Sequence, residues 1–257
     1  MKVEGFRLGG RHLNKPVYTC RYEGLARARP FCMGENMIIN SKLSDKALLN
    51  AIYLAASKYK SLIGNSYLII GKNKKTDYFW FQCYFEKKHF MHLLGIDSTT
   101  LSATEFFEKC DLYNRGQGEG IEMTDCTPSR NHNRTTINEK CSCCADMLNI
   151  KNAKYMKVGL KDKISKYVDF TYGYGSMATL GFREHHNTSF PITLIPRNID
   201  DFVTQKYKII FVLQKKNEEE KYRNIISEAK KGLFEELYDE FPDTVKNLYE
   251  RNENFTK

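Results

Sequence analysis

Two apolar periodicities follow one another along this 257-residue chain, and their order restricts the fold more than any other feature. Residues 45–62 carry apolar side chains at helical spacing, and Ser44 or Asp45 can cap the helix that this spacing predicts. Later in the chain, short apolar runs bounded by glycine, proline and charged residues predict strands, the strongest being Ile209–Leu213. Helices followed by mostly antiparallel strands predict an α+β fold.

The same patterns place the remaining elements. Further helices are expected over 86–96, 101–113, 137–149, 217–238 and 242–250. Strands are expected over 67–70, 78–85, 167–172, 177–183, 191–195 and 207–213. We therefore expect N-terminal helices, an antiparallel sheet of about four to six strands, and a closing C-terminal helix. The closing helix would bury one apolar face through Ile225, Ile226, Ala229, Leu233 and Leu237.

The chain is expected to divide into three parts. Residues 1–43 are rich in arginine and predict loops or a hairpin. Residues 44–238 predict the principal domain, with a polar, glycine-containing excursion inserted at 114–138. Residues 239–257 predict a short helix and a tail.

The charge distribution favours a polyanionic partner. The chain carries a formal net charge of +9, and the acidic residues are concentrated in 217–257, where acidic groups outnumber basic ones. A basic surface attracts nucleic acid, although a lysine-rich surface can equally be a solvated one. The sequence has no apolar run long enough for a membrane span and none that resembles a signal peptide, so we expect a cytoplasmic protein.

Eight cysteines lie at irregular spacing, which argues against a disulfide framework. Cys141, Cys143 and Cys144, with Cys126 upstream, are weak candidates for a zinc site, because they do not form a paired CxxC pattern. Buried reduced thiols are the favoured interpretation, and we expect no metal. The glycines of 116–120 and 173–175 match neither phosphate-binding fingerprint, so no nucleotide cofactor is expected.

Two histidine-containing segments are candidates for acid–base chemistry. In the first, His89 and His92 are three residues apart on a predicted helix, and Lys88 precedes them. A histidine near its ordinary pKa can exchange a proton at neutral pH, as RNA cleavage requires. The alternative is that His89 lies at a helix surface and His92 is a hydrogen-bonded core residue.

The second segment spans two predicted strands and the turn between them. His185 and His186 are adjacent there, and Arg183 and Arg197 flank them along the chain. The two arginines are candidates for gripping one phosphate, with Ser189 or Thr193 as further donors. The alternative is a polar hairpin tip with solvated side chains.

Several short blocks resemble a phage- and mobile-element-borne branch of the barnase–EndoU–colicin–RelE nuclease superfamily. They are Phe90–Ile96 after two aromatic strands, the helix Ala103–Cys110, Ala178–Phe182, Phe190–Leu194 and the lysine-bordered strand Lys206–Lys215. The resemblance covers about residues 45–225 and implies helices packed on an antiparallel sheet whose concave face receives RNA. It also implies RNA cleavage without metal, often as a toxin. Of the histidines, His92 lies inside a matching block.

These observations lead to two hypotheses of different classes. In the first, the protein is a metal-independent, toxin-type RNA-cleaving nuclease that leaves a 2′,3′-cyclic phosphate. His92 would act as acid or base with His185 or His186, Thr193 would orient the phosphate, and Arg183, Arg197, Lys88 and Ser189 would bind RNA. In the second, an inactive phage or mobile-element protein of this fold inhibits a host defence nucleoprotein complex. Expected partners are therefore RNA and a protein such as an antitoxin, an immunity protein or a defence complex.

Overall fold

The computed structural model describes residues 39–75, 77–150, 156–160, 168–174, 178–201, 203 and 205–250. The helices are α1 (Asp45–Lys60), α2 (Phe90–Leu93), α3 (Ala103–Asn114), α4 (Arg134–Met147), α5 (Leu233–Leu237) and α6 (Asp243–Leu248). Short 3-10 turns are η1 (Lys87–His89), η2 (Met123–Asp125), η4 (Ile199–Asp201) and η5 (Tyr238–Glu240). The expected N-terminal segment, apart from residues 39–43, lies outside the described residues, as do residues 251–257.

The strands form an α+β arrangement with these helices, as predicted. They are β1 (Asn65–Lys72), β2 (Tyr78–Tyr84), β3 (Ile96–Asp97), β4 (Thr127–Pro128), β5 (Met156–Leu160), β6 (Phe170–Tyr174), β7 (Ala178–His185), β8 (Thr188–Ile195), β9 (Lys206–Lys216) and β10 (Asn224–Glu228). In the described residues the principal sheet has eight strands in the order β1-β2-β8-β7-β6-β5-β9-β10. The expected number, four to six, was too low, because β5 and β10 were not predicted.

The sheet closes on itself because β9 pairs with β5 and β10 along one edge and with β1 along the other. Its first residues pair with β5, and Lys208–Lys216 pairs with β1 along the other edge. All pairings along the sheet are antiparallel except that of β2 with β8, which meet in parallel at Cys83 and Ser189. This one parallel contact joins the β1–β2 hairpin to the β7–β8 hairpin.

The predicted helix over 45–62 and the predicted strands over 67–70 and 78–85 are present at the start of the principal domain, and the two strands form a hairpin. Ser44 caps α1 by accepting a hydrogen bond from the Ala47 amide, which satisfies one of the free donors of the first turn. In the β1–β2 turn, the side chain of Asn73 accepts from the amides of Lys75 and Asp77, at 2.8 and 3.0 Å. Such an Asx turn reverses the chain between two apolar runs.

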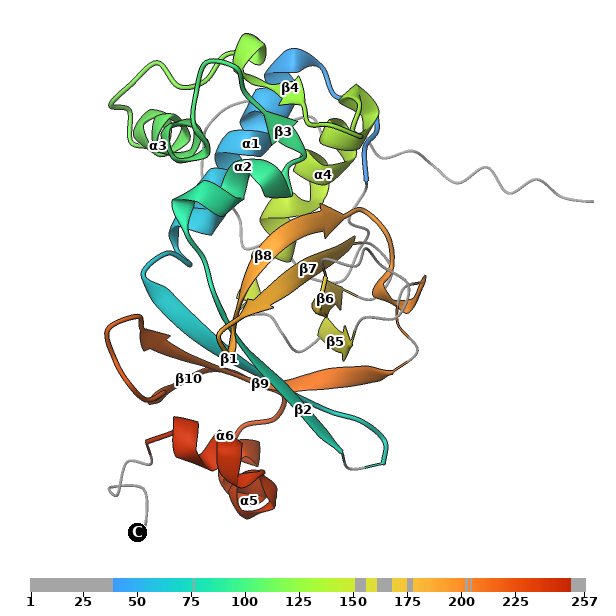
Figure 1. Ribbon diagram of the computed structural model, residues 1–257, viewed down its shortest axis with the longest axis vertical. Coiled ribbons are helices and arrows are strands. Elements are labelled where there is room, and N and C mark those ends of the chain that lie inside the picture. Colours follow the sequence, from blue (N-terminus) through green and yellow to red (C-terminus); the bar gives the residue numbers. More distant parts are fainter. Residues whose placement is uncertain are drawn as a thin grey trace, which may run out of the picture. The chain divides into compact units, whose positions relative to one another are not determined.

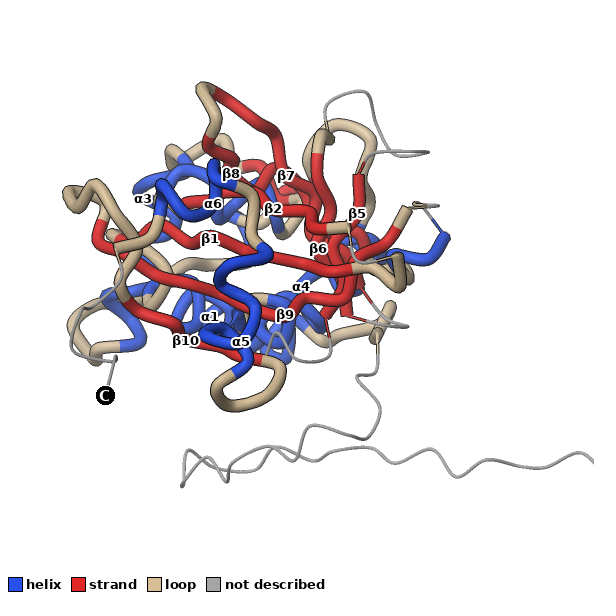
Figure 2. Tube along the Cα trace, turned by 90° about the horizontal axis from the view of Figure 1, so that it is seen from below, coloured by secondary structure: helices blue, strands red, loops and turns tan. Residues whose placement is uncertain are grey.

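Two apolar cores lie on opposite faces of the sheet (Figure 1). On one face α1–α4 cover the strands, and Tyr59 packs there against Phe85, Phe90 and Phe107. On the other, α5 and α6 cover β1 and β9, and Figure 2 shows α5 lying across these strands. No helix in the described ranges is both long and apolar enough to span a membrane.

The expected helix over 217–238 is wrong. Asn224–Glu228 instead forms β10 and pairs with β9, and the short helix α5 begins only at Leu233. Ile225 and Ile226 therefore point to opposite faces of a strand, Ile226 toward the first core and Ile225 toward the second. Residues 224–228 form a strand because they pair with the edge of β9. Apolar spacing along the chain gives no information on that pairing.

The polar segment 114–138 is exposed over much of its length but is held to the fold at buried positions. The hydroxyl of Tyr53 accepts from the Ile121 amide and donates to its carbonyl, at 3.0 Å in each case, and Ile121 is buried. Asp125 and Cys126 are buried as well, and α4 already begins at Arg134. The segment packs on α1 through these contacts although its composition is polar.

Candidate functional site

The β7–β8 hairpin ends in a two-residue turn that holds one of the predicted histidines. His186 and Asn187 have φ angles of 51° and 62°, so both lie in the left-handed region. This is the geometry of a type I′ turn, whose twist matches that of the strands, and Asn and His adopt it more readily than most residues. His185 and His186 are both exposed, with ring centroids 4.0 Å apart.

Aromatic stacking brings this hairpin against η1. The ring of His89 stacks on Phe190 of β8 with a centroid separation of 4.7 Å and an interplanar angle of 15°. Tyr84, at the end of β2, lies against both rings, with centroids 6.2 Å from Phe190 and 6.3 Å from His89. Since Arg183 is paired with Phe190 across the hairpin, the arginine belongs to the same corner of the fold. We call Tyr84, Glu86, Lys88, His89 and Phe190 the β2–β8 corner.

Charge in the β2–β8 corner is balanced by an ion pair. The Glu86 carboxylate lies 2.6 Å from Lys88 Nζ and 3.7 Å from His89 Nε2. Burial lowers the pKa of His89 to about 4, although the Glu86 charge opposes this shift. His89 is therefore neutral at physiological pH, and no described group hydrogen-bonds its buried Nδ1. The Glu86 carboxylate raises the pKa of Lys88, which stays cationic.

The alternative interpretation placed His89 at a helix surface and His92 in the core, and the structure shows the opposite burial for the two side chains. His89 is 8% exposed and lies in η1, whereas His92 is exposed on α2. Phe90, Met91 and Leu93 fill the buried positions of α2 and leave His92 to solvent. The two rings remain close enough for a charge on His92 to lower the pKa of His89.

The predicted phosphate ligands do not converge. Arg183 lies opposite Phe190, whereas Arg197 follows the far end of β8. At about 3.3 Å per residue, their positions along the hairpin are roughly 20 Å apart, so the two arginines do not grip one phosphate. Ser189 is 1% exposed, which removes its hydroxyl from the surface, and Thr193 is half-buried opposite Gly181.

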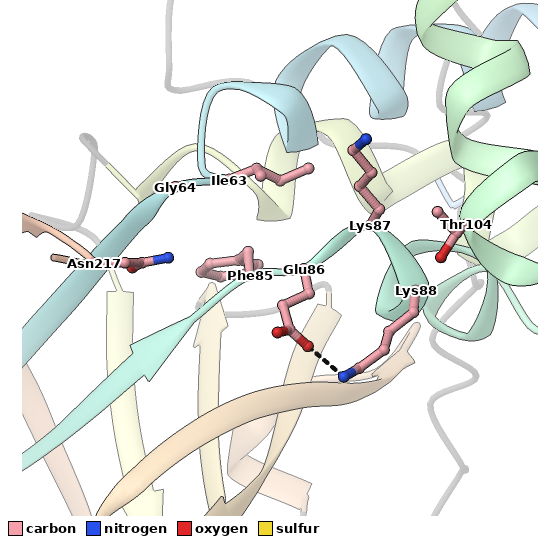
Figure 3. A pocket seen from close by; sticks show the side chains of 8 residues that line it. All are labelled: Ile63, Gly64, Phe85, Glu86, Lys87, Lys88, Thr104 and Asn217. Atoms are coloured by element: carbon pink, nitrogen blue, oxygen red, sulfur yellow. Dashed lines mark ion pairs between the residues drawn. The ribbon is translucent and has the colours of Figure 1, made fainter.

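An open pocket of about 380 Å³ adjoins the β2–β8 corner. Ile63 and Phe85 provide apolar lining, and Lys87, Thr104 and Asn217 add hydrogen-bonding groups. Figure 3 shows Phe85 and Glu86 between Asn217 on one side and Lys88 on the other. The lining therefore combines apolar surface with charged and hydrogen-bonding groups.

The cysteines proposed as weak zinc ligands are buried thiols. Cys126, Cys141, Cys143 and Cys144 are all free, and burial raises the pKa of each thiol. In the part of the chain that the structure describes, no three His, Cys, Asp or Glu side chains are grouped so that they could hold a metal ion.

Sequence reasoning missed the roles of Tyr84, Glu86 and Phe190. Phe190 follows Ser189, Glu86 lies two residues before Lys88 and Tyr84 lies near the end of a predicted strand. Their meeting, however, depends on the parallel contact of Cys83 with Ser189. These two residues are more than a hundred positions apart, and neither run carries a local signal for the pairing. In the sequence, the indication of an ion pair is the glutamate, Glu86, two residues before Lys88.

The buried, neutral His89 gives stability a specific dependence on pH. An unfolded histidine takes up a proton near pH 6.5, whereas folded His89 resists protonation until about pH 4. Stability is therefore fully present above pH 6.5 and is lost as the pH falls toward 4. Between pH 6.5 and 5 the free energy of unfolding should fall by about 2 kcal/mol.

Urea denaturation at pH 6.5 and 5 measures this effect in the wild type and in His89→Phe, which keeps the stack on Phe190. His89→Phe should lose about 2 kcal/mol less than the wild type. His185→Phe, at an exposed position, should behave like the wild type. Equal losses in all three proteins would contradict the assignment to His89.

Comparison with known proteins places this arrangement in a family. Searches of curated proteins and of solved structures gave no match. A family model described as phage-Barnase-EndoU-ColicinE5/D-RelE like nuclease4 matches residues 51–231, which is more than half of the chain and runs from α1 into the turn before α5. The chain therefore belongs to this family of phage barnase–EndoU–colicin E5/D–RelE-like nucleases.

Proposed function

We propose that the protein is a metal-independent, toxin-type endoribonuclease whose site lies between α2, η1 and the β7–β8 hairpin. The observation that carries the proposal is the stack of His89 on Phe190. This stack holds the segment with Lys88 and His92 against the strand pair with Arg183 and His185. Both segments lie inside the range 51–231 that the family model matches. This arrangement brings exposed imidazoles and cationic side chains to one edge of the fold, which supports placing the site there.

The reaction is an internal transfer at phosphorus. The ribose 2′-oxygen forms a bond to the adjacent phosphorus, and the bond from phosphorus to the 5′-oxygen of the next nucleotide breaks. A base takes the 2′-hydroxyl proton and an acid protonates the leaving 5′-oxygen, so the products are a 2′,3′-cyclic phosphate and a 5′-hydroxyl. His92 and either His185 or His186 would take these two roles, because all three imidazoles are exposed.

The remaining side chains would bind the strand. Lys88 and Arg183 lie in the same corner as the His89–Phe190 stack and would contact the scissile phosphate, which Thr193 would help to orient. Arg197 would reach a different phosphate, since it follows the opposite end of β8. Neutral His89 supports the aromatic surface of Tyr84 and Phe190, on which a base can stack, and the neighbouring pocket would hold the base or sugar.

Labelled single-stranded RNA incubated with the protein in excess EDTA tests the proposal. Cleavage should persist in the chelator, and end-group analysis should find a 2′,3′-cyclic phosphate on one fragment and a 5′-hydroxyl on the other. The same strand with 2′-deoxyribose should stay intact, because it lacks the attacking hydroxyl. Cleavage that requires a divalent ion, or that also cuts the deoxy strand, would contradict the mechanism.

One observation favours the inactive binding protein as the second candidate. Within the described residues, no hydrogen bond orients the ring of His92, His185 or His186. Catalytic histidines are commonly held by a further group that fixes the tautomer. Stoichiometric co-purification with a host defence nucleoprotein complex, together with no turnover of RNA, would favour this inhibitor over the enzyme. An antitoxin or immunity protein as partner would instead accompany turnover.

A further inference from the structure

A buried lysine lies on the helical side of the fold, beside Gly95 in the turn that follows α2. Lys140, in α4, is 3% exposed. Among the described residues, no carboxylate forms an ion pair with its ammonium group, and no hydrogen bond to Nζ is present. Burial lowers its pKa to about 8, so the side chain is still mostly charged at neutral pH. A buried charge without a counter-charge is costly, and such groups are concentrated at functional sites.

A second donor faces the same place. Ser129 Oγ lies 2.7 Å from His132 Nδ1, so the other ring nitrogen, Nε2, is left to face elsewhere. Gly95 has a φ angle of +69°, and a methyl group on its Cα would lie 3.3 Å from both Lys140 Nζ and His132 Cδ2. Since Cδ2 adjoins Nε2, this edge of the imidazole and the lysine ammonium converge beside Gly95. Lys140 Nζ and His132 Cδ2, each about 3.3 Å from this methyl position, are therefore about 6.6 Å apart at most.

Local backbone contacts hold this geometry. The Ser129 amide donates to the Gly95 carbonyl at 3.0 Å, and the His132 amide donates to the Ser129 carbonyl at 2.8 Å. The turn that carries His132 is thus fixed to the end of the Phe90–Ile96 block, and α4 begins directly after it with Asn133 as cap. Ser129 and His132 are partly exposed, so polar side chains that reach solvent lie near the lysine ammonium.

We propose that Lys140 and His132 form an oxyanion site that binds a phosphate group beside Gly95. An anion between the two donors supplies the counter-charge that Lys140 lacks and accepts from Nζ and from Nε2–H when Ser129 donates to Nδ1. Glycine at position 95 keeps the two donors unobstructed, because any side chain there would be crowded against the lysine and the imidazole. The site does not depend on the proposed cleavage, because binding at it requires no turnover.

Thermal unfolding with two probes tests the site and separates its ligand sources. Inorganic phosphate represents a free phosphate, and a dithymidine phosphodiester represents a nucleic acid backbone that cannot be cleaved through a 2′-hydroxyl. Each is compared with chloride at equal ionic strength. At about ten times its dissociation constant, a bound probe should raise Tm by roughly 3–6 °C.

Two variants make the test specific. Lys140→Met should weaken probe binding about tenfold or more, because it removes a charge-assisted bond, and the Tm response should fall to about a third of the wild-type response or less. His132→Phe should lose most of the response too, and it covers the case in which Lys140→Met fails to fold. Lys46→Met, at an exposed position of α1, should respond like the wild type. A response to phosphate alone assigns a free phosphate, and a response to the diester assigns a nucleic acid backbone. No response to either probe, or a full response in Lys140→Met, would overturn the site.

Discussion

Replacing His92 with alanine is expected to lower the rate of RNA cleavage by about 10²–10⁴-fold, the usual contribution of one general acid or base. The side chain is exposed on α2, so its removal should leave the fold intact. The pH–rate profile of the wild type should be bell-shaped, because one imidazole must be neutral and another protonated. His92→Ala should lose one limb of that profile, which a general loss of folded protein would not cause.

The second imidazole is identified by the double variant. His185→Ala alone should also reduce the rate, and the double variant with His92→Ala should fall to the level of residual binding and electrostatic effects. Cleavage that survives in the double variant with an unchanged profile would contradict acid–base roles for these histidines. If His186→Ala abolished the second limb of the pH–rate profile and His185→Ala did not, His186 would be the second acid–base group.

The elements that sequence predicted well are those decided by neighbours along the chain. The cap of α1 at Ser44 is set within a few residues of its own position, as is the Asn73 turn of the first hairpin. The capping box of α3 is equally local, since Ser102 and Glu105 bond each other's backbone. In each case side chain and backbone partner are two to four positions apart, so composition and spacing sufficed.

The predictions failed where pairing with a strand that is distant in the sequence determines the secondary structure. The residues of β10 have apolar spacing and helix-forming neighbours, yet Asn224 pairs with Gln214 and Ile225 with Leu213. Gly232, with a φ of 81°, then separates this strand from the following helix. Similarly, β5 is embedded in a lysine-rich stretch and is recognisable only through its pairing with β6 and β9.

The candidate site shows the same division. The β7–β8 hairpin with its two histidines was predicted, because its turn chemistry is local. The β2–β8 corner was not, because His89 and Phe190 are a hundred residues apart and meet through a single parallel contact. The exchange of burial between His89 and His92 has the same origin, since Phe190 provides the surface on which one of the two imidazoles is buried.

The second core provides the other large expected effect, through Phe234. Its ring is 1% exposed and packs edge-on against Phe211 and Tyr249, with centroid separations of 5.0 and 4.8 Å. Its amide also donates to the Glu228 carboxylate at 2.7 Å, which ties α5 to the end of β10. Phe234→Ala should therefore cost about 3–5 kcal/mol, the usual range for a buried phenylalanine.

Such a loss is a large share of the total stability of an ordinary domain, about 5–15 kcal/mol. Urea denaturation measures it directly, with Leu54→Ala as the matched control, because Leu54 is 51% exposed on α1 and should change stability little. If Phe234→Ala behaved like Leu54→Ala, the packing of α5 on the β1–β9 face would be wrong. A large loss in Phe234→Ala alone would support the strand-and-short-helix structure of residues 224–237, because that arrangement seats this ring between Phe211 and Tyr249.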